Sequence, residues 1–99
     1  MSKINIFLDD VRNAPEGYIR TWTVEETVMM IFQNQGGIDI LSLDNDLGLD
    51  QLEGYKVLDW MESIVHSDPN FILPDQIRVH SANPVARKRM EVIIQKLWK

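Results

Sequence analysis

Two kinds of hydrophobic pattern alternate along this chain. Short runs rich in apolar and β-branched residues predict buried strands at residues 4–8, 38–43 and 76–81. Residues 18–22 alternate between polar side chains and side chains that are β-branched or aromatic, which predicts an edge strand. Residues 11–17 contain Asn, Pro and Gly, so we expect a loop between the first two strands. The pattern thus predicts four strands.

The segments after the second, third and fourth strands carry apolar residues at helical spacing instead. We expect helices at residues 23–35, 54–66 and 84–97. Thr23 and Glu26 form a capping box, in which each side chain can bond a backbone amide of the first turn. Asn83 followed by Pro84 also predicts a helix start, because Asn caps free amides and Pro suits the first helical position.

Strands that alternate with helices predict an α/β fold. We expect a mostly parallel four-stranded sheet, right-handed crossovers and helices on both faces, which makes three layers. Repeats, linkers and low-complexity runs are lacking, so residues 1–99 are expected to form a single domain. In such sheets ligands bind beyond the carboxyl ends of the strands. The residues that follow each strand are therefore the candidates for function.

Composition narrows the possible chemistry. The 99 residues contain no Cys, which excludes disulfides, thiolate metal sites and cysteine nucleophiles. An apolar stretch long enough to span a membrane is lacking, and we expect a cytoplasmic protein with no membrane partner. The net charge is −5, but residues 85–99 hold five basic residues and one acidic residue, so the rest carries −5 − 4 = −9. This acidic remainder argues against an extended nucleic-acid surface.

The acidic residues gather after two of the predicted strands. Asp9 and Asp10 follow the first strand, and Asp44 and Asp46 follow the third. Clustered carboxylates repel each other and can be stabilised by a hard cation, so we expect Mg²⁺ or Mn²⁺ here. Asp9, Asp10 and Asp44 are the expected ligands, with Asp46 as a further ligand or general base. The alternative is that these side chains only cap turns.

The last predicted strand ends in a different group of polar residues. His80 can act as a general acid or base near neutral pH, and Ser81 can donate a hydrogen bond to a phosphoryl oxygen. Free amides at the helix start around Asn83 suit an anion such as phosphate. Arg12 and Arg87 are the candidate phosphate clamps. The alternatives are a structural role for His80 and solvent-exposed or paired positions for the two arginines.

Three motifs resemble the strand ends of response-regulator receiver domains. They are Leu8-Asp-Asp10, Leu41-Ser-Leu-Asp44 and Val79-His-Ser-Ala82. In that family the first acidic pair holds Mg²⁺, the aspartate matching Asp44 accepts a phosphoryl group, and the residue matching Ser81 contacts it. Only one helix fits between Asp10 and Gly37, and the printed sequence ends with the helix after Ser81. The resemblance therefore implies a truncated receiver-like, or flavodoxin-like, fold.

A narrower resemblance covers nearly the whole chain. The segments 7–12, 42–48 and 78–84 are similar to cyclic-phosphate processing receiver domains. Asn45 departs from the His expected at this position in many members. The resemblance implies that the substrate is a cyclic phosphate on a nucleotide or at the end of a nucleic acid. The spacing of residues alone does not imply a substrate.

We therefore expect a metal-dependent phosphoesterase, with His80, Asp44 and Asp46 in the catalytic roles. Asp9, Asp10 and Asp44 would bind the cation. The residues expected to bind the phosphate are Arg12, Ser81, Asn83 and Arg87. Two other functions stay open: a module that binds a nucleotide phosphate without chemistry, and a degenerate receiver that serves protein interaction.

Overall fold

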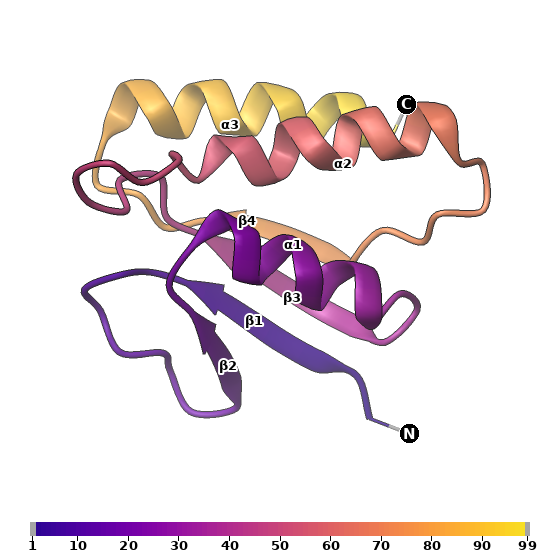
Figure 1. Ribbon diagram of the computed structural model, residues 1–99, viewed down its shortest axis with the longest axis horizontal. Helices are drawn as coiled ribbons and strands as arrows, with labels where there is room; N and C mark the ends of the chain where they lie inside the picture. Colours follow the sequence, from indigo (N-terminus) through magenta and orange to yellow (C-terminus); the bar gives the residue numbers. More distant parts are fainter. Residues whose placement is uncertain (1, 99) are drawn as a thin grey trace.

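The sheet contains four parallel strands, and three helices connect or follow them (Figure 1). The computed structural model describes residues 2–98. In chain order the elements are β1 (Ile4–Leu8), β2 (Tyr18–Thr21), α1 (Val24–Gln33), β3 (Ile38–Leu43), α2 (Tyr55–Ser67), β4 (Gln76–Val79) and α3 (Pro84–Leu97). The strand order is β2-β1-β3-β4, so β1 and β3 are central. The expected α/β fold with a parallel sheet is confirmed.

A single hydrophobic core lies between the sheet and all three helices. Ile6, Leu8, Leu41 and Leu43 point from the central strands into this core. The residues that meet them from the helices are Val24 and Ile31 of α1, Val57, Leu58 and Met61 of α2, and Met90 and Leu97 of α3. These alternate strand residues all point to the side of the sheet that the helices cover. The core therefore lies against one face of the sheet.

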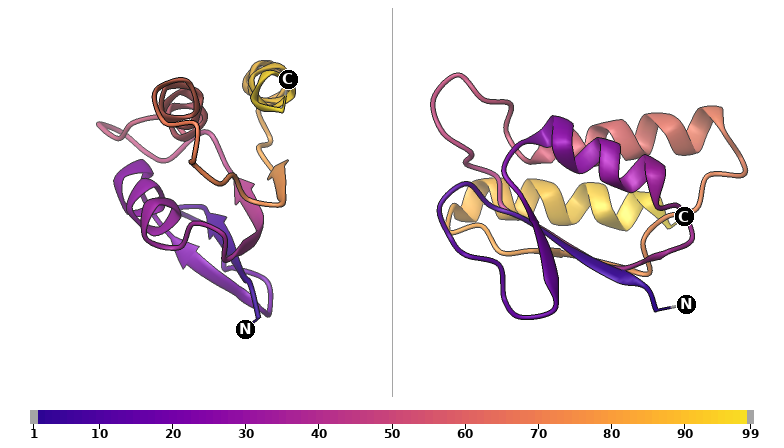
Figure 2. Two further views of the ribbon diagram at one scale, coloured as in Figure 1. Left: turned by 90° about the vertical axis from the view of Figure 1, so that its right-hand side faces the viewer. Right: turned by 60° about the horizontal axis from the view of Figure 1, so that its bottom comes forward.

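The expectation of helices on both faces is wrong. Phe7, Ser42 and Arg78 are aligned on neighbouring strands and have the opposite orientation to the core residues. Among the described residues no helix packs on this face, which we call the uncovered face (Figure 2). The two crossovers that contain helices, from β2 to β3 and from β3 to β4, progress in the same direction along the sheet. Right-handed connections then place both helices on one side.

The predicted helix starts are both confirmed. The Thr23 hydroxyl accepts a hydrogen bond from the amide of Glu26, and the Glu26 carboxylate accepts one from the amide of Trp22. The Asn83 side chain accepts hydrogen bonds from the amides of Val85 and Ala86, with Pro84 at the first position of α3.

In the described part of the chain, no helix has the length and apolar character that a bilayer crossing requires.

Candidate functional site

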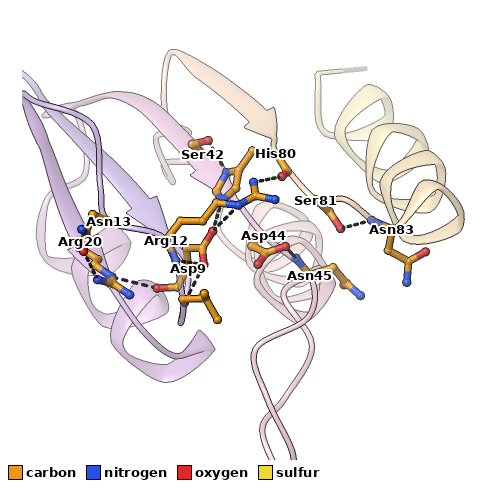
Figure 3. A network of polar contacts seen from close by, with 11 residues as sticks. Asp9, Arg12, Asn13, Arg20, Ser42, Asp44, Asn45, His80, Ser81 and Asn83 are labelled. Carbon is orange, nitrogen blue, oxygen red and sulfur yellow. Dashed lines mark hydrogen bonds and ion pairs between the residues drawn. The ribbon is translucent and has the colours of Figure 1, made fainter.

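The carboxyl ends of β1, β3 and β4 bring three side chains together. Backbone hydrogen bonds continue the sheet by one residue past the strands, from Asp44 N to Leu8 O at 3.0 Å and from His80 N to Leu43 O at 3.0 Å. Asp9, Asp44 and His80 each lie two residues after an aligned residue of the uncovered face. Each offers a ligand atom, and these three atoms lie within 4.8 Å of one another. We call this group the cation cluster (Figure 3).

Asp9 is a buried carboxylate that accepts several hydrogen bonds. Its Oδ1 atom accepts hydrogen bonds from the amides of Val11 and Arg12, both at 2.9 Å, and its Oδ2 atom lies 3.1 Å from His80 Nε2. Burial alone would raise the pKa of Asp9, but these bonds outweigh it and hold the pKa below its usual value. Asp9 is therefore ionised at neutral pH, and its carboxylate is fixed in position.

His80 is held on three sides. Its ring stacks on Phe7 with the centroids 4.2 Å apart and the planes 4° from parallel. Nε2 faces Asp9, and Nδ1 lies 2.7 Å from the Ser42 hydroxyl oxygen. Burial lowers the pKa of His80, although the hydrogen bond to Asp9 and the nearby carboxylate charges oppose this. The ring is therefore neutral at neutral pH, and since an ionised carboxylate only accepts, Nε2 carries the proton.

Asp44 is the half-buried member of the cation cluster. Burial raises the pKa of Asp44, and the negative charge of Asp9 adds to the shift, against a 2.8 Å hydrogen bond from the amide of Asn45. The second carboxylate oxygen of Asp44 has no hydrogen bond within the described part of the chain. Two carboxylates that disfavour each other's charge form a site where a cation would be stabilising.

The donor set of the cation cluster fits a divalent ion. Two carboxylate oxygens and one imidazole nitrogen suit Mn²⁺ and similar transition ions, whereas Mg²⁺ favours oxygen ligands alone. Of the two cations expected from the sequence, Mn²⁺ therefore fits the residues better. The cluster contains Asp9 and Asp44 from the expected ligand set and His80 in place of Asp10.

Arg12 is the basic side chain beside the cation cluster. Its Nη1 atom donates a 2.9 Å hydrogen bond to the carbonyl oxygen of His80, and its Nε atom lies 3.9 Å from Asp9 Oδ2. The side chain is about half exposed. Among the described residues the remaining guanidinium nitrogen has no hydrogen bond, so it can donate to an anion.

Two acidic residues expected in the site lie outside the cation cluster. Asp10 is not among the residues whose ligand atoms meet, and its carboxylate lies next to Gly48. Asp46 is exposed, and its carboxylate accepts a 3.4 Å hydrogen bond from the side-chain amide of Asn45. Neighbouring residues at a strand end point in opposite directions, so a pair such as Asp9-Asp10 can place only one side chain on a given face.

The start of α3 has its amides occupied. Ser81 is buried and accepts a hydrogen bond from the amide of Asn83 at 3.1 Å, which leaves its hydroxyl hydrogen as the one group to offer a phosphate. The amides of Val85 and Ala86 donate to the Asn83 side chain. The amide of Arg87 donates to the Asn83 carbonyl oxygen at 2.9 Å, and the Arg87 side chain is exposed. The expectation of free amides at this helix start is wrong, because the cap uses them.

The loop after Asp44 is tightly fixed. Asn45 is buried; its side chain accepts a hydrogen bond from the amide of Tyr55 at 3.1 Å and donates one to Glu53 at 2.9 Å. Gly54 packs against the backbone of Asp44 so closely that a Cβ atom would overlap the Asp44 carbonyl oxygen. The departure from His at position 45 therefore places a structural amide at this point, where it joins the end of β3 to the start of α2.

Two contributors to the site, Ser42 and Phe7, were missed by sequence reasoning. Both belong to the uncovered face and contact the ring of His80. The available signal was the two-residue period of the strands, because Phe7 and Ser42 stand two residues before Asp9 and Asp44.

Comparison with known proteins assigns a family. A family model described as "Cyclic-phosphate processing Receiver domain" matches residues 4–96 of the 99. No curated protein and no solved structure matches the chain. The matched region includes every residue of the cation cluster and Arg12.

Proposed function

Because the chain belongs to the family of cyclic-phosphate processing receiver domains, we propose that it is a divalent-cation-dependent phosphoesterase that opens cyclic phosphates. The observation that carries the proposal is the cation cluster, with three ligand atoms within 4.8 Å at the edge of the sheet where α/β folds bind ligands. The substrate would be a cyclic phosphate on a nucleotide or at the end of a nucleic acid.

Asp9, Asp44 and His80 would hold the cation. When bound, it supplies positive charge that polarises a phosphoryl oxygen and eases the loss of a proton from water. Asp9 needs little reorganisation, because two backbone amides already fix its carboxylate. The Asp44 carboxylate has one oxygen without a hydrogen bond in the described structure, and this oxygen is available to accept a proton from water.

Arg12 would bind the substrate phosphate. Its guanidinium is anchored on the carbonyl oxygen of His80, which leaves its outer nitrogen free to donate to a phosphoryl oxygen. The hydroxyl hydrogen of Ser81 is a second donor at the same edge of the sheet. Arg87 lies in the first turn of α3, and its side chain is exposed. It could therefore contact a part of the ligand farther from the cation cluster.

The reaction adds one water molecule. A bond forms between phosphorus and the water oxygen, and the bond from phosphorus to one ring oxygen breaks. Asp44 would accept the proton from the attacking water. Asp46 is exposed and lies outside the cation cluster, so its contribution as a base would be smaller. We assign His80 to cation binding through Nε2, and a nitrogen that binds a cation has no proton to give, so the departing alkoxide takes its proton from solvent.

The direct test is turnover of a panel of cyclic phosphates, including 2′,3′-cyclic and 3′,5′-cyclic nucleotides, with Mn²⁺ or Mg²⁺. We expect a monoester product from at least one compound. The Asp44→Asn variant should lose at least about 100-fold in rate, whereas Asp46→Asn, an exposed change of the same chemistry, should lose far less. Tight binding of a compound that is recovered unchanged would contradict the proposal.

That contradicting result defines the second candidate function, a module that binds a cyclic phosphate without chemistry. The engagement of both His80 nitrogens favours it, since Asp9 and Ser42 leave the imidazole no free group for proton transfer. Such a module would show saturable stabilisation by its ligand with no product.

A further inference from the structure

Ser42 is a buried serine that contacts the functional site without belonging to the cation cluster. It lies in β3 on the uncovered face, and its hydroxyl oxygen is 2.7 Å from His80 Nδ1. Phe7 stacks on the His80 ring, so the ring cannot rotate without losing this stacking contact. The ring position is therefore fixed by one hydrogen bond at each nitrogen and by one stacked face.

The hydrogen-bond roles in the cation-free protein follow from Asp9. Because Asp9 is an acceptor only, His80 Nε2 donates to it across 3.1 Å. A neutral imidazole then has its lone pair on Nδ1, so the Ser42 hydroxyl donates its hydrogen to Nδ1.

These roles must be reversed when His80 binds a cation through Nε2. A metal ligand needs a lone pair at the binding atom, so the Nε2 proton has to leave and Nδ1 has to carry one. The ring stays neutral if one proton passes from Nε2 to solvent and one from solvent to Nδ1. Nδ1 then donates, and its partner must accept.

We propose that Ser42 is a positioning residue that allows His80 to exchange tautomers in place, donating to Nδ1 without the cation and accepting from Nδ1 with it. This inference rests on the proposed function, because it assigns His80 to the cation. A hydroxyl suits the role since it can act as donor or acceptor by rotating about one bond. Partners that orient a ligating histidine in this way typically contribute 10- to 100-fold in metal affinity.

The first measurement is the tautomer of His80, from ring ¹⁵N chemical shifts. The chain has two histidines, and His66 is exposed at the end of α2, so the spectrum is simple and contains its own reference. We expect the Nε2-protonated form without metal and the Nδ1-protonated form after addition of Zn²⁺, used as a diamagnetic probe. A wild-type ring that is Nδ1-protonated without metal, or that keeps its Nε2 proton with Zn²⁺ bound, would overturn the inference.

The second measurement is affinity for Mn²⁺ and Zn²⁺ by calorimetry. Ser42→Ala should weaken binding about 10- to 100-fold, and Ser42→Thr, which keeps the hydroxyl, should recover most of the loss. Unchanged affinity in Ser42→Ala, when Asp44→Asn abolishes binding, would sink the role of Ser42 and leave the proposed function standing. Conversely, tautomer exchange as expected without turnover of any cyclic phosphate would reject the proposed function and leave the role of Ser42 standing.

Discussion

At the scale of single residues, the site depends on which side of a strand end each side chain takes. Asp9 and His80 share the orientation of Phe7 and Arg78, and this is why they meet. The sequence motif was enough to single out Asp9, Asp44 and His80. It could not separate Asp9 from Asp10, because that choice depends on strand register, which a short apolar run does not fix.

The contact between buried Asp9 and partly buried His80 gives the stability of the protein a predictable pH dependence. The pKa of His80 is lowered in the folded protein, so as pH falls below about 6.5 the unfolded chain takes up a proton before the folded protein does. Stability without metal should therefore fall with decreasing pH below that value, by at most about 1.4 kcal/mol per pH unit from this group.

Chemical denaturation at a series of pH values measures this effect. The His80→Gln variant should be less stable at neutral pH, because it removes the ring that stacks on Phe7, but should show a flatter pH dependence in the same window. Parallel curves for the wild type and this variant would show that His80 is not the responsible group.

At the scale of elements, the cation cluster depends on how α2 is joined to β3. The loop folds back so that Gly54 donates a 2.8 Å hydrogen bond to the carbonyl oxygen of Asn45 and packs on the Asp44 backbone. Gly54 has helical angles, φ −57° and ψ −28°, that any residue can adopt. The need for glycine here is thus one of space, which local sequence patterns do not reveal.

Gly54→Ala should therefore destabilise the protein and also disturb the cluster. The added methyl group overlaps the Asp44 carbonyl, so we expect about 1–3 kcal/mol of lost stability, measured by urea denaturation, together with weaker Mn²⁺ binding. Ser63→Ala, an exposed change in the same helix, should stay within about 0.5 kcal/mol of the wild type. Equal stability of the two variants would mean that the loop can relax around a side chain.

Helix ends show what local sequence does predict. Thr23 and Asn83 cap α1 and α3 as expected, because capping depends on residues only a few positions apart. The same success removes a functional expectation, since a well-capped start of α3 has no free amides for phosphate. Arg12, at the neighbouring strand end, is then the basic group best placed for an anion.

At the scale of the whole molecule, the sheet has one covered and one uncovered face. The alternation of strands and helices predicted the parallel sheet, but a strand pattern does not state how many helices lie on each side. The loop between β1 and β2 contains no helix, and the two helical crossovers progress in the same direction, so all three helices share a core. Phe7 and Ser42 hold His80 in position, and both lie on the face that this arrangement leaves without a helix.

We propose that Asp9, Asp44 and His80 form one cation site. The most direct measurement is the thermal unfolding midpoint of the wild type and of Asp44→Asn with increasing Mn²⁺, with Asp46→Asn as control. We predict that Mn²⁺ raises the midpoint of the wild type and of Asp46→Asn in a saturable way and leaves Asp44→Asn unchanged. Without metal, Asp44→Asn should be at least as stable as the wild type, because it removes a charge whose burial raises the pKa of Asp44. Equal stabilisation of all three proteins by Mn²⁺, or of none, would contradict the claim.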